Sequence, residues 1–198
     1  MKKIVIATQN EGKVAEIKDL LKNFNFKIYS LNKFSSFEPK ENGKNFIDNS
    51  IIKALNAVKI TNLPSIADDS GLCVSVLNNE PGIYSARWAG KNKDFSMAAN
   101  KIEKKIKSIS TSNKKDLRAF FCCALTLALP DGRIKSFEGK VFGKLQFPPK
   151  GYNGFGYDPI FIPRGYRKTF GEMKYSFKER ISHRKKAFIK LEKFLKKI

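Results

Sequence analysis

The chain has 198 residues, of which 41% are hydrophobic and 29% charged, and it carries a formal net charge of +21 at pH 7. These proportions are typical of a globular protein and exclude a disordered one, and no apolar run approaches the roughly 20 residues that a membrane-spanning helix needs. The apolar stretch at residues 4–7 is too short for the core of a signal peptide. We therefore expect a cytoplasmic protein without a membrane partner.

The positive charge is spread along the chain. The excess is almost all lysine, from Lys2 to Lys197, without one dominant block. Basic surfaces attract polyanions through counterion release. Diffuse lysine without clusters of arginine and aromatic residues nevertheless favours a solvated surface over a specific nucleic-acid site. The charge would still help to attract a polyphosphate substrate.

The cysteines indicate neither disulfides nor a metal site. There are three of them, Cys73, Cys122 and Cys123, with no paired spacing. The adjacent pair stands in an apolar segment, where a thiol behaves as a small hydrophobic group. We expect buried free thiols.

Hydrophobic periodicity and turn residues predict alternating strands and helices, and then a long hairpin. Strands are predicted at 3–7, 26–30, 65–67, 72–77, 118–129, 134–145 and 159–162, and helices at 14–24, 46–58, 95–106 and 181–195. Between the third helix and the strand at 118 lies a polar stretch at 108–116. This order predicts one α/β domain over residues 1–198, with a mixed, elongated central β-sheet flanked by helices. We expect two lobes with the active-site cleft between them.

Polar residues connect the first strand to the first helix in the string Thr8-Gln9-Asn10-Glu11-Gly12-Lys13. A helix N-terminus presents backbone N–H groups that favour anions. Lys13 would add a charge able to reach a phosphate. An asparagine cap beside a surface lysine would give the same string, so it does not decide between the two.

Two adjacent carboxylates follow a short apolar strand in Asp68-Asp69-Ser70-Gly71. Such a pair is destabilising unless a cation or several donors offset its repulsion. Mg²⁺ prefers carboxylate and phosphate oxygens and takes one or two protein carboxylates per site. The alternative is a capped turn with solvated acids.

A glycine-rich loop surrounds an aromatic residue at 151–159. Such a loop can approach a ligand closely while Phe155 offers a ring on which a nucleobase stacks. Asp158, held extended before Pro159, could accept a hydrogen bond from a sugar or a base. A plain turn can have the same composition.

The only histidine, His183, stands beside Ser182 and Arg184, shortly after Lys178. A single histidine cannot form a metal site and is more often structural. At the start of a helix these residues could instead donate hydrogen bonds to a carbonyl-rich ligand.

Together these strings closely resemble the inosine triphosphate pyrophosphatase family, whose members hydrolyse deaminated purine nucleoside triphosphates. The resemblance covers essentially the whole chain and keeps the family's order. Two features depart from it: residues 174–177 lack the acids expected there, and the high positive charge has no counterpart. The six matching strings are Thr8-x-Asn10-x-x-Lys13, Phe46-Ile47-x-Asn49 with Lys53-Ala54, Ala67-Asp68-Asp69-Ser70-Gly71-Leu72, Pro81-Gly82-Ile83-Tyr84-Ser85-Ala86-Arg87, Gly154-Phe155-Gly156-Tyr157-Asp158-Pro159 and Ile181-Ser182-His183-Arg184.

The resemblance implies cleavage of the α–β phosphoanhydride of ITP, dITP or XTP to a monophosphate and pyrophosphate, with Mg²⁺ as cofactor, which would remove these nucleotides from the pool. Glu41 and Asp69 would hold Mg²⁺. Asp69 would also serve as the base or orient the water, with Asp68 supporting it. The phosphate contacts implied are Thr8, Gln9, Asn10, Glu11, Gly12, Lys13 and Lys53.

Base recognition is implied for the later strings. Phe155 would stack on the purine, and Arg184 with a protonated His183 would donate to a 6-oxo group, where adenine offers a donor instead. The family's members are homodimers, with residues 81–88 as an interface or a rim of the site. The remaining residues implied around base and sugar are Ser70, Gly156, Tyr157, Asp158 and Lys178.

Two other functions remain open at this point. A pyrophosphatase of related fold would prefer dTTP or modified pyrimidine nucleotides. A nucleic-acid-binding protein, suggested by the net charge, would show tight and salt-sensitive binding that survives Asp69→Asn.

Overall fold

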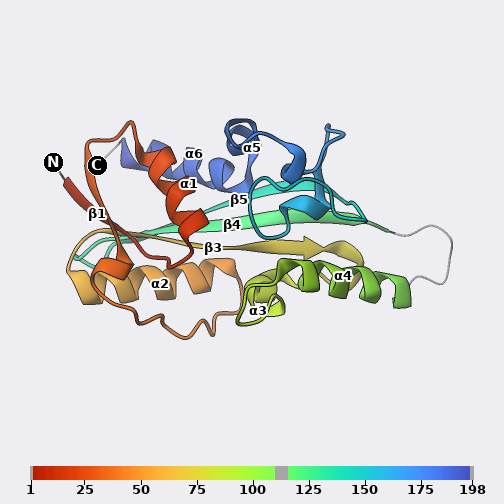
Figure 1. Cartoon of the computed structure of the whole chain (residues 1–198). Helices are drawn as coiled ribbons and strands as arrows, with labels where there is room; N and C mark the ends of the chain where they lie inside the picture. The colour runs from red at the N-terminus through yellow and green to blue at the C-terminus, as the bar shows by residue number, and fades with distance from the viewer. Residues whose placement is uncertain (1, 110–115, 197–198) are drawn as a thin grey trace. The chain divides into compact units, whose positions relative to one another are not determined.

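The computed structural model describes residues 2–109 and 116–196. Most of its helices and strands are labelled in Figure 1. In chain order the elements are β1 (Lys2–Ile6), α1 (Glu11–Leu21), β2 (Phe26–Ser30), η1 (Leu31–Lys33), α2 (Phe46–Thr61), β3 (Ser65–Val74), η2 (Ser75–Leu77), η3 (Gly82–Tyr84), α3 (Ser85–Trp88), α4 (Phe95–Ile109), β4 (Arg118–Ala128), β5 (Ile134–Leu145), η4 (Asp158–Ile160), β6 (Phe161–Pro163), η5 (Phe170–Glu172), α5 (Tyr175–Ile181) and α6 (His183–Leu195).

The strands form one mixed sheet in the order β2-β1-β3-β4-β5-β6. β1 pairs in parallel with β2, with Ile4 opposite Ile28, and in parallel with β3, with Ile6 opposite Ile66. β5 and β6 are antiparallel. The predicted α/β class and mixed sheet are confirmed. No helix of the described residues has both the length and the hydrophobicity to cross a membrane.

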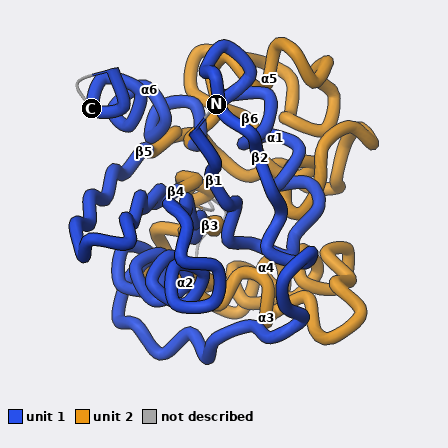
Figure 2. The backbone as a smooth tube through the Cα atoms, turned by 90° about the vertical axis from the view of Figure 1, so that its left-hand side faces the viewer, with its two compact units in different colours: residues 1–69, 123–139, 184–198 blue, residues 70–122, 140–183 orange. Residues whose placement is uncertain are grey.

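The described chain divides into two compact units, coloured separately in Figure 2. Unit 1 comprises residues 1–69, 123–139 and 184–198, and unit 2 comprises 70–122 and 140–183. One boundary falls inside β3, between Asp69 and Ser70.

In unit 1 the two-residue period of the strands sends alternate side chains to opposite faces of the sheet. Ile4 and Ile6 pack on the face that α1 and α6 cover, and Val5 and Ala7 pack on the face that α2 covers (Figures 1 and 2). Both faces are therefore dry, which explains why β1 is a nearly continuous apolar run.

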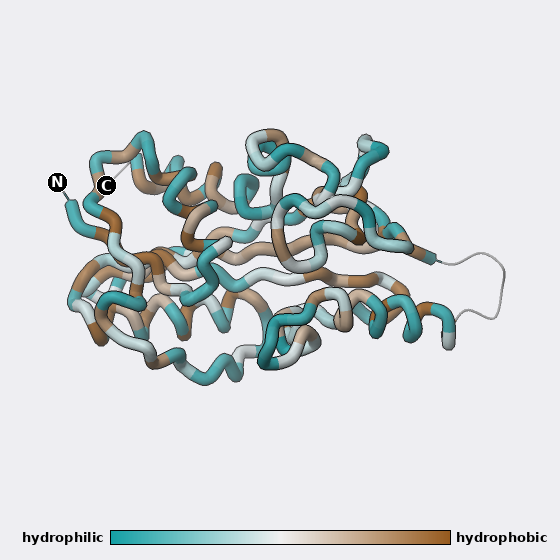
Figure 3. Tube along the Cα trace, viewed as in Figure 1, coloured by the Kyte–Doolittle hydropathy of each residue, from teal (hydrophilic) through white to brown (hydrophobic). Residues whose placement is uncertain are grey.

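Unit 2 has its own core. In α4 the residues Ala98, Ala99, Ile102 and Ile106 are buried, at the spacing of one helical face. Figure 3 accordingly shows brown and teal stretches alternating along α4, as one hydrophobic and one hydrophilic face require. The cluster also contains Phe121, Phe161 and Phe170 from β4, β6 and η5. All three cysteines are buried thiols outside any disulfide, as predicted.

Several predicted boundaries were wrong. The strands predicted at 65–67 and 72–77 form the single strand β3, followed by the 3-10 turn η2, because β3 continues through its carboxylates. The terminal helix predicted at 181–195 is α6, which begins at His183 because Ser182 is extended (φ −66°, ψ 157°), and the preceding helix α5 was not predicted. The predicted polar stretch at 108–116 lies largely outside the described residues.

Candidate active site

The loop between β1 and α1 is ordered by its own side chains. The Asn10 side chain caps α1 by accepting from the Lys13 backbone N–H at 3.0 Å. The Thr8 hydroxyl oxygen accepts from the Asn10 N–H at 3.2 Å. The Gln9 amide donates to the Ser36 carbonyl at 2.8 Å. Asn10 is thus the N-cap of α1, and Lys13 lies within the first turn of this helix.

Asp68 is fully buried on the face of the sheet that α1 and α6 cover. Its carboxylate receives the Lys13 ammonium at 2.6 Å, the Arg184 Nε at 2.8 Å and the Cys123 thiol at 3.0 Å. Burial raises the pKa of Asp68, but Lys13 and the hydrogen bond from Cys123 outweigh it and hold the pKa below its ordinary value. Asp68 is therefore ionised and committed to its partners.

Arg184 joins Asp68 to a second buried acid. Its guanidinium also pairs with Glu16 of α1, and both side chains are about 1% exposed. Burial lowers the pKa of Arg184 to about 9, which still leaves it charged at neutral pH. The two carboxylates balance the positive charge of the guanidinium and accept hydrogen bonds from its N–H groups. The structure thus places Arg184 in the interior of unit 1.

Asp69 faces the opposite side of the sheet, where α2 lies. It accepts from the Lys53 ammonium at 2.9 Å and from the Asn49 amide at 3.2 Å. Lys53 also pairs with Glu41 at 2.8 Å. Burial raises the pKa of Asp69 and Lys53 offsets this only in part, whereas the pKa of Lys53 is raised because Asp69 and Glu41 outweigh its burial. Two acids therefore share one ammonium.

The neighbouring acids consequently have different environments. The strand period separates their side chains, so Asp68 meets α1 and α6 while Asp69 meets α2. No group of three or more His, Cys, Asp or Glu side chains in the described residues could hold a metal by itself. Glu41 and Asp69 nevertheless converge on one cationic group. Mg²⁺ is usually bound by one or two protein carboxylates together with substrate phosphate oxygens and water.

In unit 2 the glycine-rich loop wraps around Asp158. The buried Asp158 carboxylate accepts from the Lys178 ammonium at 2.7 Å and from the Phe155 N–H at 2.9 Å. A Cβ on Gly154, whose φ is +76°, would lie 2.0 Å from Asp158 Oδ2, so glycine is required here. Burial raises the pKa of Asp158, and Lys178 opposes this. The loop and α5 are thus joined by a buried ion pair.

Lys178 also lies over an aromatic ring. Its ammonium is 4.8 Å from the centroid of Phe155, a distance typical of a cation–π contact. His183, two residues after α5 ends, stacks on Phe121 with centroids 4.8 Å apart and an interplanar angle of 12°. The structure therefore brings Phe155, Asp158 and Lys178 together within unit 2.

Tyr157 differs from the expectation of a substrate contact. It is 3% exposed, and its hydroxyl donates to the Ser85 carbonyl at 2.9 Å. Gly156, beside it, has a positive φ and lies close to Phe95. Ser70 is half-buried. Tyr157 thus supports the loop from inside.

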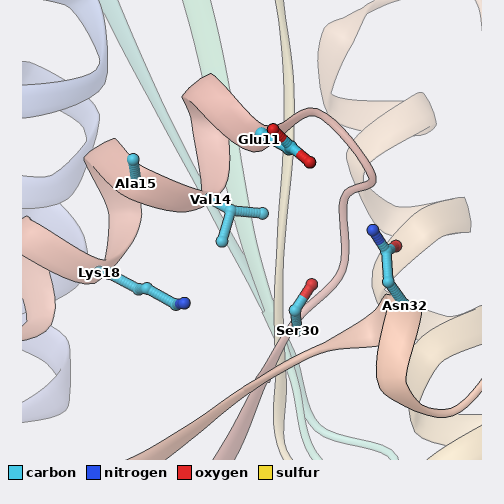
Figure 4. A pocket seen from close by; sticks show the side chains of 6 residues that line it. All are labelled: Glu11, Val14, Ala15, Lys18, Ser30 and Asn32. Carbon is cyan, nitrogen blue, oxygen red and sulfur yellow. The ribbon is translucent and has the colours of Figure 1, made fainter.

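An open pocket of about 340 Å³ lies beside α1, between this helix and residues Ser30 and Asn32 (Figure 4). It shares only Glu11 with the expected phosphate string, and neither Lys13 nor Asp68 lines it. The carboxylates described above gather elsewhere. Its lining residues are Glu11, Val14, Ala15, Lys18, Ser30 and Asn32.

Sequence reasoning assigned no role to Glu16, Asn49, Cys123 or Ser85. Glu16 offered a signal, because an acid between Lys13 and Ile17 stands on the buried face of α1. Asn49 and Ser85 belong to two of the strings that match the family, but neither residue was assigned a role of its own. Cys123 offered no signal beyond its apolar setting.

The sequence matches the profile of the Ham1 family over residues 4–194. The chain belongs to the Ham1 family. The resemblance expected from the six strings is thereby confirmed.

Ham1 relatives match in both sequence and structure. The chain is 45% identical to the dITP/XTP pyrophosphatase of Caulobacter vibrioides, covering 96% of each chain. It is 44% identical to the dITP/XTP pyrophosphatase of Zymomonas mobilis, covering 96% of this chain and 90% of the relative. The Ham1 protein structure from Coxiella burnetii superposes with a TM-score of 0.90 at 36% identity over the full length of both chains.

Proposed function

We propose that this Ham1 chain hydrolyses the α–β phosphoanhydride of deaminated purine nucleoside triphosphates, releasing a monophosphate and pyrophosphate. The observation that carries the proposal is the pair Asp69 and Glu41 on the single ammonium of Lys53. Relatives that share nearly the whole chain carry the name dITP/XTP pyrophosphatase. ITP, dITP and XTP are the proposed substrates.

The phosphate end lies in unit 1. Lys13 and Lys53 supply positive charge, and the first turn of α1 supplies backbone N–H groups. Asp68 holds the Lys13 ammonium and does not act as the base, because it is buried and bonded to three donors. Thr8 and Asn10, with Gln9, Glu11 and Gly12 beside them, shape the loop.

Asp69 and Glu41 would hold Mg²⁺, which supplies charge neutralisation at the phosphate oxygens. When Lys53 turns to the phosphate, the Asp69 carboxylate is left able to accept a proton from water. Asp69 suits that role better than Asp68, because three donors already occupy the Asp68 carboxylate. We propose Asp69 as the base or water-orienting residue.

The base end is proposed in unit 2. Phe155 offers a ring for stacking, and its neighbours Lys178 and Asp158 supply one donor and one acceptor. Donors from Lys178 and a protonated His183 suit a 6-oxo group and would face another donor in adenine. A donor role for Arg184 requires its guanidinium to leave Asp68 and Glu16. Ser70 and Gly156 would line the sugar and base.

We further propose a single catalytic domain over residues 1–198, acting in the cytoplasm as a homodimer without a nucleic-acid partner. An exposed aromatic residue within 81–88 supports the dimer: Tyr84 is 47% exposed, with the Arg87 guanidinium over its ring. Light scattering with Tyr84→Ser tests this. A wild-type monomer would contradict it.

A triphosphate panel tests the function. We expect pyrophosphate from ITP, dITP and XTP, much less from dATP, dTTP and UTP, and loss of activity with EDTA. Asp69→Asn should abolish turnover, whereas Asp131→Asn, in the exposed hairpin turn, should not. Faster release from dTTP or UTP would indicate the pyrimidine enzyme, and salt-sensitive nucleic-acid binding that persists in Asp69→Asn would indicate the binding protein.

A further inference from the structure

Ser85, the first residue of α3, uses both hydrogen-bonding capacities of its hydroxyl. The Leu72 N–H of β3 donates to Ser85 Oγ at 3.0 Å, and Ser85 Oγ donates to the Gly82 carbonyl at 2.7 Å. Ser85 is 5% exposed, so water does not compete for these bonds. The hydroxyl thus fastens β3 to the segment of η3 and α3.

The close approach of β3 to Ser85 leaves no space for a side chain. A Cβ on Gly71 would lie 2.4 Å from Ser85 Oγ and 2.3 Å from the Gly82 carbonyl oxygen, which is backbone. Glycine is therefore required at position 71 for β3 to reach Ser85. The position of Ser70 is fixed by the same contact, since it precedes Gly71 directly.

The backbone of Ser85 holds a second segment. Its carbonyl accepts from the Tyr157 hydroxyl at 2.9 Å, and the Tyr157 ring packs edge-on against Phe95 with centroids 5.1 Å apart. Tyr157 directly precedes Asp158, whose carboxylate pairs with Lys178. One residue therefore contacts both the Ser70–Leu72 stretch and the loop that carries Phe155 and Asp158.

Resting on the proposed function, we propose that Ser85 is a positioning residue for nucleobase recognition. Its hydroxyl fixes Ser70–Leu72, and its carbonyl fixes Tyr157 and with it the loop at 154–158. Ser70 and the loop at 154–158 are the proposed contacts to base and sugar, and they belong to unit 2, as Ser85 does. The proposed phosphate and water residues Lys13, Lys53 and Asp69 belong to unit 1. Disturbing Ser85 should therefore weaken base recognition more than the chemical step.

Two variants separate the two hydrogen bonds of the Ser85 hydroxyl from the bond that Tyr157 donates to the Ser85 carbonyl. Ser85→Ala removes the hydroxyl, and Tyr157→Phe removes the hydroxyl that reaches Ser85 while keeping the ring and its packing. Each should raise KM for dITP roughly fivefold, the size of one buried hydrogen bond, and should lower the preference for dITP over dATP. The kcat should change less than twofold. The matched controls are Tyr152→Phe, since Tyr152 is fully exposed in the same loop, and Ser108→Ala on the exposed end of α4.

Hydrogen–deuterium exchange separates positioning from local structure. Ser85→Ala should speed amide exchange in residues 153–160, and Tyr157→Phe should speed it in residues 70–73, each at the segment that was not altered. The double variant should change KM by less than the product of the single changes, because the two bonds act through one residue.

A rise in KM with faster exchange at the distant segment would support the proposal. Unchanged KM and base preference in folded Tyr157→Phe, or a fall in kcat alone, would overturn it. Wild-type protein that released pyrophosphate from no triphosphate would refute the proposed function instead. The exchange measurement still decides the linkage in that case, because it needs no turnover.

Discussion

Asp68→Asn and Asp69→Asn should affect stability very differently, although the two residues are adjacent and the substitutions are isosteric. Asp68→Asn removes the charge that Lys13 and Arg184 share. Removing one partner of a buried ion pair costs about 3–5 kcal/mol. In a chain of this size each kcal/mol shifts Tm by about 2–4 °C, so we expect a fall of roughly 6–20 °C.

Asp69→Asn should change the free energy of unfolding by less than about 1 kcal/mol. Burial raises the pKa of Asp69, which means that folding disfavours its ionised form. A neutral side chain removes that penalty, and Lys53 keeps Glu41 as its partner. Turnover should nevertheless be abolished, since the proposed base is gone.

The pH dependence has a definite sign. Because the folded pKa of Asp68 is depressed, its ionisation stabilises the fold above about pH 4, the range of an unfolded aspartate, and this contribution is lost as the pH falls through the folded pKa. The stability difference between wild type and Asp68→Asn should therefore shrink below about pH 4.

Urea denaturation followed by circular dichroism, at pH 7 and pH 3.5, measures these differences. Asp131→Asn, at the exposed hairpin turn, is the matched control and should leave the midpoint unchanged. If Asp69→Asn destabilised the protein as much as Asp68→Asn did, the separation of the two acids into different environments would be refuted.

Two further predictions concern the loop around Asp158. Gly154→Ala should raise KM for dITP and destabilise the fold by about 1–3 kcal/mol, because its Cβ would displace Asp158 at a positive φ. Gly132 has a φ of +87° but open space around it, so Gly132→Ala should lower the stability measured by thermal melting less than Gly154→Ala does. Equal losses of stability in the two variants would contradict the steric cause. Lys178→Met should destabilise by about 3–5 kcal/mol because it leaves Asp158 buried without its ion-pair partner. Adding Asp158→Asn should recover part of that loss in urea denaturation, and no recovery would contradict the pairing.

Much of the fold followed from local pattern. Two-residue and helical periods predicted the strands and helices of the α/β class, and six strings predicted the family. The continuity of β3 could not be predicted, because carboxylates interrupt its apolar pattern. They are tolerated since Lys13 and Arg184 neutralise Asp68, and Arg184 lies 116 positions away. The break in the helix at Ser182 was not predicted, because the apolar spacing continues across this residue.

The different environments of Asp68 and Asp69 also could not be predicted from the sequence. An acid pair at a predicted strand end reads as one site, whereas a pair inside a strand points to opposite faces of the sheet. The pairing of Arg184 with Glu16 could not be predicted either, because the two residues are 168 positions apart in the sequence. The neighbours Arg184 and His183 therefore have different surroundings: Arg184 pairs with Asp68 and Glu16, whereas His183 stacks on Phe121.

The most direct test of the central claim is the identity of the products from dITP. Phosphorus NMR of a reaction with Mg²⁺ should show dIMP and pyrophosphate in equal amounts, with little product from dATP under the same conditions and none with Asp69→Asn. Release of dIDP and inorganic phosphate, or equal turnover of dATP, would contradict the account.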